Sequence, residues 1–102
     1  MRKKPSPQLV AYLEDAGRRL SARTKWVDHI FPKMVQRWGL IEAIERLMVS
    51  GDIQPGFRKC IELNLSDCTF EAAVLRFPDE FTRGARESAE FRLRMVNEGI
   101  RL

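Results

Sequence analysis

Apolar side chains recur every three or four positions along most of the chain, the spacing of one face of an α-helix. The first such stripe consists of Leu9, Leu13, Ala16 and Leu20. It follows Ser6 and Pro7, a capping hydroxyl and then the residue favoured at the first helical position. The pattern predicts a first helix that starts at Pro7 and closes near Arg23.

A second set of seven large apolar residues follows Thr24, which can cap a helix. The set is Trp26, Val27, Ile30, Phe31, Met34, Val35 and Trp38. We expect one helix here, kinked or broken at Pro32 and ended by Gly39. Seven such residues are many for a small domain, so some of them could face a partner or a second copy of the chain.

Four further segments have helical spacing, and no segment alternates as a strand would. We expect a third helix from Leu40 to the turn at 50–52, a fourth over 57–63, a fifth over 70–76, and a last one from the Thr82 cap to Gly99. On the last helix, opposite charges four residues apart indicate a solvated face: Arg83–Glu87, Arg86–Glu90 and Glu90–Arg94. The chain is therefore predicted to be all-α, a single compact domain of five or six short helices over 7–102, behind a disordered basic arm, 1–6.

The apolar stripes also predict which side chains form the core. We expect it to be built around Leu13, Leu20, Val27, Ile30, Val35, Ile44, Leu47, Phe57, Ile61, Phe70, Val74 and Leu93. With 44% hydrophobic and 31% charged residues in 102 positions, the chain has the composition of a globular domain with a charged surface.

Residues suited to catalysis or metal binding are scarce: there is one histidine, His29, and two cysteines, Cys60 and Cys68. Asp28 and His29 are adjacent, so on a helix they point in different directions and cannot act as an orienting pair. Cys60 is interpreted as a small core residue, whereas Cys68 lies at a helix start that could lower its pKa. We expect no catalytic residues, no cofactor and no metal, and so no enzyme.

Basic residues are concentrated in the first third of the chain. Residues 1–37 carry nine basic and three acidic groups, whereas the remainder carries nine and eleven. The candidate binding residues are Arg18, Arg19, Arg23, Lys25, Lys33 and Arg37. This asymmetry favours an acidic partner, and the leading hypothesis is a non-catalytic adaptor or regulatory module that binds a protein, either another chain or a second copy.

The alternative hypothesis is a nucleic-acid-binding module that uses the same basic residues in the N-terminal third of the chain. An enzyme is the least favoured of the three hypotheses. The turn at 50–56 is long for a helix-turn-helix, and the helix after it offers only Arg58 and Lys59 as base readers. No apolar run is long enough to span a membrane, and no apolar stretch follows the basic start as in a secretory signal. The expected location is therefore the cytoplasm.

Several short motifs from Trp38 onward resemble those of a family of small, uncharacterised bacterial helical domains. They are Gly39 with Ala43 and Arg46-Leu47; Gly56-Phe57; Leu65-x-Asp67 leading into Thr69-x-Glu71-x-x-Val74-Leu75; Phe81-Thr82; and Ala89-x-x-Arg92-Leu93. The resemblance covers slightly over half the chain and implies a bacterial helical domain without a specified activity. Arg83 and Gly84 stand where the family pattern has acidic residues.

Overall fold

The computed structural model describes residues 3–99, which form α-helices and two short 3₁₀ helices without a strand. The helices are α1 (Pro7–Ser21), α2 (Phe31–Trp38), α3 (Leu40–Val49), α4 (Pro55–Glu62), η1 (Ser66–Cys68), α5 (Phe70–Arg76), η2 (Pro78–Glu80) and α6 (Arg83–Asn97). The predicted all-α class is confirmed. The first two residues of the predicted basic arm and residues 100–102 lie outside the described part.

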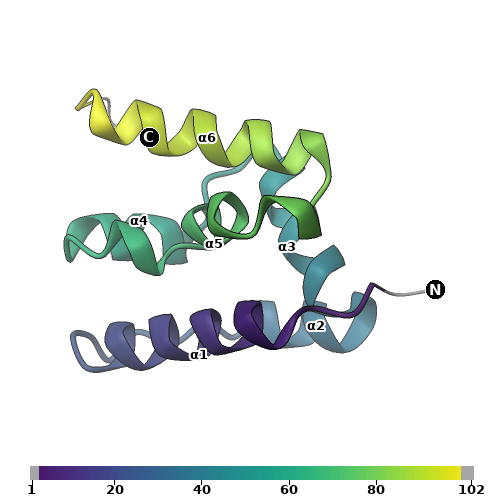
Figure 1. Ribbon diagram of the computed structural model, residues 1–102. Helices are drawn as coiled ribbons and strands as arrows, with labels where there is room; N and C mark the ends of the chain where they lie inside the picture. Colours follow the sequence, from purple (N-terminus) through teal and green to yellow (C-terminus); the bar gives the residue numbers. More distant parts are fainter. Residues whose placement is uncertain (1–2, 100–102) are drawn as a thin grey trace.

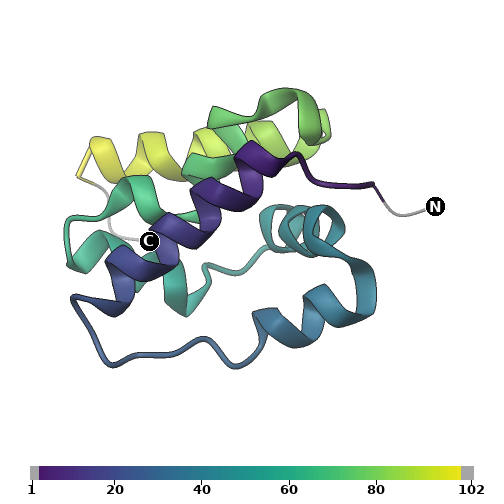
Figure 2. The same ribbon diagram turned by 60° about the horizontal axis from the view of Figure 1, so that its bottom comes forward.

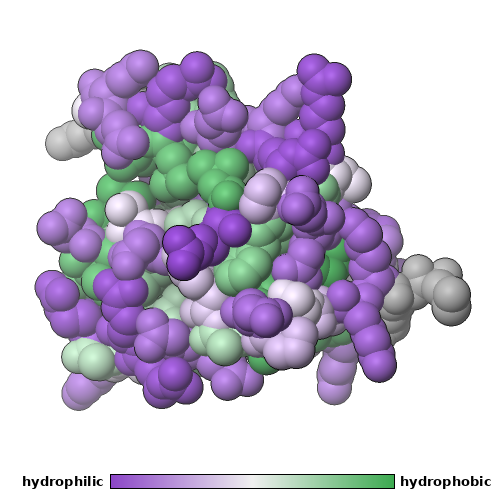
Figure 3. Space-filling view, viewed as in Figure 1, coloured by the Kyte–Doolittle hydropathy of each residue, from purple (hydrophilic) through white to green (hydrophobic). Residues whose placement is uncertain are grey.

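The helices lie in layers, with α6 along one edge, α4 and α5 in the middle, and α1 and α2 along the opposite edge (Figure 1). α3 packs against both α2 and α6, and α5 packs against α6 and α1. Buried side chains from several helices form the core: Leu9, Ile41, Ile44, Leu47, Met48, Ala73, Val74, Phe81, Ala85 and Ala89. Hydrophilic side chains cover much of the face seen in Figure 1, with apolar surface visible between them (Figure 3).

Three helices begin at a hydroxyl cap, and two of these caps, Ser6 and Thr82, are predicted from the sequence. Ser6 Oγ accepts a hydrogen bond from the backbone N–H of Leu9, at 3.1 Å. Thr69 and Thr82 cap α5 and α6 in the same way: each hydroxyl accepts a hydrogen bond from the backbone N–H three residues later in the sequence. Each hydroxyl satisfies a backbone donor that the first helical turn leaves without a partner.

The second predicted helix starts later than expected, because residues 22–30 are not helical; we call this segment the strap. The Asp28 carboxylate accepts from the backbone N–H groups of Ile30 and Phe31, both at 2.9 Å, and so sets the start of α2. Pro32 then lies in the first turn, where its missing N–H costs no hydrogen bond. The proline helps to start this helix and does not break it.

The predicted core is partly right. Ile44, Leu47, Phe57 and Val74 are buried, whereas Leu13, Leu20, Val35, Ile61, Phe70 and Leu93 are half-buried. The expectation was wrong for Val27 and Ile30, which are 59% and 68% exposed. Both belong to the strap, which crosses the outside of the domain and does not present a helical face to the core.

Some polar side chains that the sequence places on the surface make hydrogen bonds within the domain, both in the N-terminal segment and on α6. Lys3 Nζ donates to the Glu80 carbonyl oxygen at 3.0 Å, and Ser6 donates to the Glu80 carboxylate through both its N–H and its hydroxyl, at 2.7 and 2.6 Å. On α6 the Arg83–Glu87 pair forms at 2.8 Å, as expected. Arg86, however, donates to the carbonyl oxygens of Pro78 and Phe81 and thereby ties α6 to η2.

Candidate functional site

The six basic residues selected from the sequence are all exposed, and five of them lie in the strap or within the helical turn next to it, whereas Arg37 lies in the last turn of α2. Arg18 and Arg19 end α1, Arg23 and Lys25 belong to the strap, and Lys33 and Arg37 lie on α2. The strap joins the end of α1 to the start of α2 (Figure 2).

Arg19 has an internal role. Its guanidinium makes two hydrogen bonds to the Asp67 carboxylate, at 2.6 and 3.3 Å. This hydrogen-bonded cation lowers the pKa of Asp67, and the same bond raises the pKa of Arg19. The Tyr12 hydroxyl donates to the Asp67 carbonyl oxygen at 2.6 Å. Asp67 thus holds α1 against η1, and Arg19 is committed to that contact.

Two more of the six cations have neighbours on their own helices. Arg18 lies 3.7 Å from the Asp15 carboxylate. The Arg37 guanidinium lies 5.0 Å from the centroid of the Trp38 ring, which Arg46 also contacts at 4.0 Å. Both distances are in the range of cation–π attraction. Trp38 is therefore engaged by arginines of the domain itself.

Arg23, Lys25 and Lys33 have no carboxylate partner among the residues that the structure describes. We call them the strap cations. The exposed side chains of Val27 and Ile30 lie between them in the sequence. We call these five residues the strap face. The charged members of the strap face are among the binding residues predicted from the sequence. Val27 and Ile30 were predicted to be core residues, although they belong to the apolar set of which some members could face a partner.

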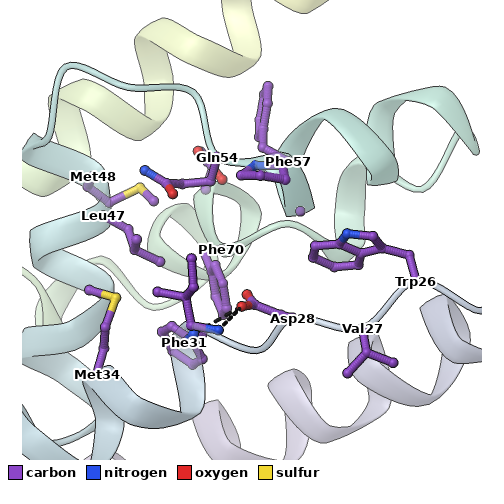
Figure 4. A pocket seen from close by; sticks show the side chains of 14 residues that line it. Trp26, Val27, Asp28, Phe31, Met34, Leu47, Met48, Gln54, Phe57 and Phe70 are labelled. Carbon is purple, nitrogen blue, oxygen red and sulfur yellow. Dashed lines mark hydrogen bonds between the residues drawn. The ribbon is translucent and has the colours of Figure 1, made fainter.

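Two neighbouring cavities lie behind the strap. The first, of about 190 Å³, is bounded by the strap and helices α2 to α5 and is named the α2–α4 cavity (Figure 4). The second, of about 200 Å³, is bounded by α1, the strap, α2, α4 and α5 and is named the α1–α4 cavity. They share the aromatic side chains of Trp26, Phe31, Phe57 and Phe70. Both cavities are partly open to solvent.

The polar groups around these cavities have partners. Asp28, which lines both cavities, caps α2, and Glu71, which lines the α2–α4 cavity, pairs with Arg92 at 2.9 Å. Burial raises the pKa of Cys60 to about 11 and also raises that of Cys68 above its ordinary value. The neighbouring helix start, which could have lowered the pKa of Cys68, does not outweigh this effect of burial. No group of three metal-ligating side chains occurs within residues 3–99.

The structure weakens the helix-turn-helix interpretation further. α3 packs mainly against α2 and α6, and the long turn at 50–54 separates it from α4. On α4, Lys59 pairs with Glu62 at 3.2 Å. None of the described helices is long and apolar enough to cross a membrane.

No protein-family model matches the chain, and neither a curated protein nor a solved structure is significantly similar to it. The resemblance to small bacterial helical domains therefore stays a prediction, and the functional argument rests on the geometry of this chain.

Proposed function

We propose that the protein is a non-catalytic module that binds a protein partner through the strap face, and that the bound segment is acidic and amphipathic. One observation carries the proposal. Val27 and Ile30, 59% and 68% exposed, lie in the sequence between exposed cations that have no carboxylate partner within the described residues. Single exposed apolar residues are common, but here two exposed apolar residues are flanked along the chain by cations, the combination expected of an apolar centre with a charged rim.

The two parts of the strap face would contribute differently to binding. Burial of Val27 and Ile30 removes apolar surface from water and supplies most of the affinity. The strap cations remain at the wet rim, where they accelerate association with an acidic segment more than they strengthen the complex. A binding segment of this kind presents apolar side chains on one side and carboxylates on both flanks.

The proposal is tested with a fluorescein-labelled helical peptide of 16 residues that has leucines at helical spacing and glutamates elsewhere. A matched peptide carries lysines in place of the glutamates. We expect saturable binding of the acidic peptide in fluorescence anisotropy and no binding of the basic one. Equal binding of the two peptides would remove the electrostatic argument, and absence of binding to either would contradict the proposal.

Variants assign the binding to the strap face. The double variant Val27→Ser, Ile30→Ser is expected to bind the acidic peptide with at least tenfold lower affinity. Val49→Ser is the control, because Val49 is 62% exposed but lies at the end of α3, away from the strap. Circular dichroism confirms that each variant is folded. Equal losses in the double variant and the control would contradict the assignment.

The contribution of charge is tested separately by converting the three strap cations to glutamine. The control converts Arg76, Arg83 and Arg94, which are exposed on α5 and α6, so that both variants lose the same net charge. We expect only the strap variant to reduce the association rate and the salt dependence. Equal effects would show that overall charge, and not the strap face, attracts the peptide.

Nucleic-acid binding is the competing outcome. The same anisotropy assay is run with a 20-base-pair DNA duplex and a 20-nucleotide RNA at two salt concentrations. Phosphate contacts release counterions and give a steep loss of affinity with salt. Tight, steeply salt-dependent binding that is unchanged by Val27→Ser and Ile30→Ser would favour this alternative and contradict protein binding through the strap face.

A further inference from the structure

We infer that the α1–α4 cavity is a binding site for a small, uncharged aromatic ligand of one or two rings, covered by the strap. This inference goes beyond the proposed function: it concerns the inner side of the strap, and its test uses no peptide. Failure of one proposal therefore leaves the other standing.

The size of the cavity matches such a ligand. The α1–α4 cavity measures about 200 Å³, whereas an engineered apolar cavity of about 150 Å³ in another protein stays dry and binds benzene. Aromatic rings of Trp26, Phe31, Phe57 and Phe70 form part of the wall. Such rings attract a second ring in edge-on or offset contacts, which favours an aromatic ligand over an aliphatic one.

The chemistry of the wall explains why the ligand is uncharged. Thr69 Oγ1 donates to the Ser66 carbonyl oxygen at 2.8 Å and accepts from Ala72 N–H at 3.0 Å. The Asp28 carboxylate is engaged by two backbone N–H groups, and no buried side-chain nitrogen or oxygen among the described residues lacks a partner. The raised pKa values of Cys60 and Cys68 keep both thiols neutral at physiological pH. An anionic ligand would lose its hydration here without compensation and would also face the Asp28 carboxylate.

Small residues leave the space open. Ala16 and Gly17 on α1 and Gly56 on α4 line the cavity, where larger side chains would fill it. A Cβ atom on Gly56 would meet the Trp26 ring at 3.3 Å, so the absence of a side chain there allows the indole to lie against α4. Figure 4 shows the Trp26 ring directed toward the first turn of α4.

The strap provides a route into the cavity. Its hydrogen bonds are local: Trp26 N–H donates to Thr24 Oγ1, and Asp28 binds the two N–H groups that follow it. Of the strap residues, Trp26 and Asp28 line the α1–α4 cavity. Segments that are held by few contacts with distant parts of the chain open at low cost in free energy. Because Trp26 also lines the α2–α4 cavity, its ring has space to move when a ligand binds.

The test uses toluene and the fluorescence of Trp26. Trp38→Phe leaves Trp26 as the single tryptophan, because the chain has two. We expect toluene to change its emission in a saturable manner and to raise the melting temperature, since a ligand that binds only the folded state stabilises it. Benzoate, with the same ring and a charge, should do neither. A non-saturable or absent response to toluene, or an equal response to benzoate, would overturn the inference.

A cavity-filling variant locates the site. Ala16→Leu introduces a larger side chain into the α1–α4 cavity and should weaken toluene binding at least tenfold. Ala11→Leu, on the exposed side of the same helix, is the matched control and should leave binding unchanged. If Ala16→Leu does not fold, Gly17→Leu replaces it, because the space around a Cβ atom at Gly17 is open to 4 Å. Undiminished binding in the folded filling variant would place toluene elsewhere and contradict the inference.

Discussion

Glu71 and Arg92 form an ion pair inside the domain, with side chains only 3% and 7% exposed. Arg92 Nη1 donates to Glu71 Oε2 at 2.9 Å, and Nη2 lies 3.4 Å from the Asp52 carbonyl oxygen. The pair therefore joins α5, α6 and the turn before α4. Burial raises the pKa of Glu71, although the hydrogen bond from Arg92 opposes that shift.

Removing one partner of this pair should destabilise the protein far more than removing both. Glu71→Leu or Arg92→Met leaves a buried charge without compensation, and we expect each to lower the free energy of unfolding by about 3–5 kcal/mol. The double variant should recover most of that loss. Urea denaturation measures all three, with Arg83→Met, which removes an exposed pair, as a control expected to cost under about 1 kcal/mol. Additive losses in the double variant would contradict this account.

The Arg19–Asp67 pair predicts a specific pH dependence. Because Arg19 lowers the pKa of Asp67 in the folded protein from its ordinary 3.8, the unfolded chain binds the proton more readily. The stability from this pair is thus present above that ordinary value and is lost as the pH falls through the lowered pKa. With Asp67 57% exposed, the contribution is at most about 1 kcal/mol.

Urea denaturation between pH 2 and pH 7 tests this sign. Asp67→Asn should lower stability at pH 7 and converge with the wild type at the acid end. Asp15→Asn is the control, since the contact of Asp15 with Arg18 is longer, at 3.7 Å, and exposed. A constant difference between Asp67→Asn and the wild type at every pH would show that the pair does not titrate as described.

The two thiols should be slow to react in the folded protein. Burial raises the pKa of Cys60 to about 11 and raises that of Cys68 as well, so the thiolate fraction at pH 8 is small. We expect labelling by iodoacetamide at pH 8 to be much slower than in urea, with Cys60 slower than Cys68 because Cys60 is the more buried. Mass spectrometry of the labelled peptides distinguishes the two. Rapid native labelling of Cys60 would contradict its burial.

Local signals made much of this fold predictable. Ser6 and Thr82 start helices because their hydroxyls and the apolar stripes that follow them are adjacent in the sequence. The strap was missed because Trp26, Val27 and Ile30 share the period of a buried helix. The decisive contact is the acceptance by Asp28 of the backbone N–H groups of Ile30 and Phe31, at the start of α2, whereas the sequence shows Asp28 only as a neighbour of His29.

The candidate site was less predictable, because its members depend on distant partners. Charge alone could not separate Arg19 from Arg23, since Asp67 lies 48 residues beyond Arg19 in the sequence. Glu71 and Arg92, 21 residues apart, belong to motifs noted in the sequence, but nothing local shows that they are buried together. The cavities, likewise, are a property of five packed segments and have no sequence signal.

Asp28 should control where α2 begins. Asp28→Ala removes the acceptor for two backbone N–H groups, and we expect a loss of about 1 kcal/mol, as for other helix caps. Asp28→Asn keeps a side-chain oxygen that can accept these hydrogen bonds, so it should lose less stability than Asp28→Ala. Asp52→Ala is the control, because Asp52 accepts hydrogen bonds through its backbone carbonyl. Hydrogen exchange should accelerate at the amides of Ile30 and Phe31 in Asp28→Ala alone. Unchanged exchange there would mean that Pro32 and the packing of α2 on α3 set the start of the helix without the carboxylate.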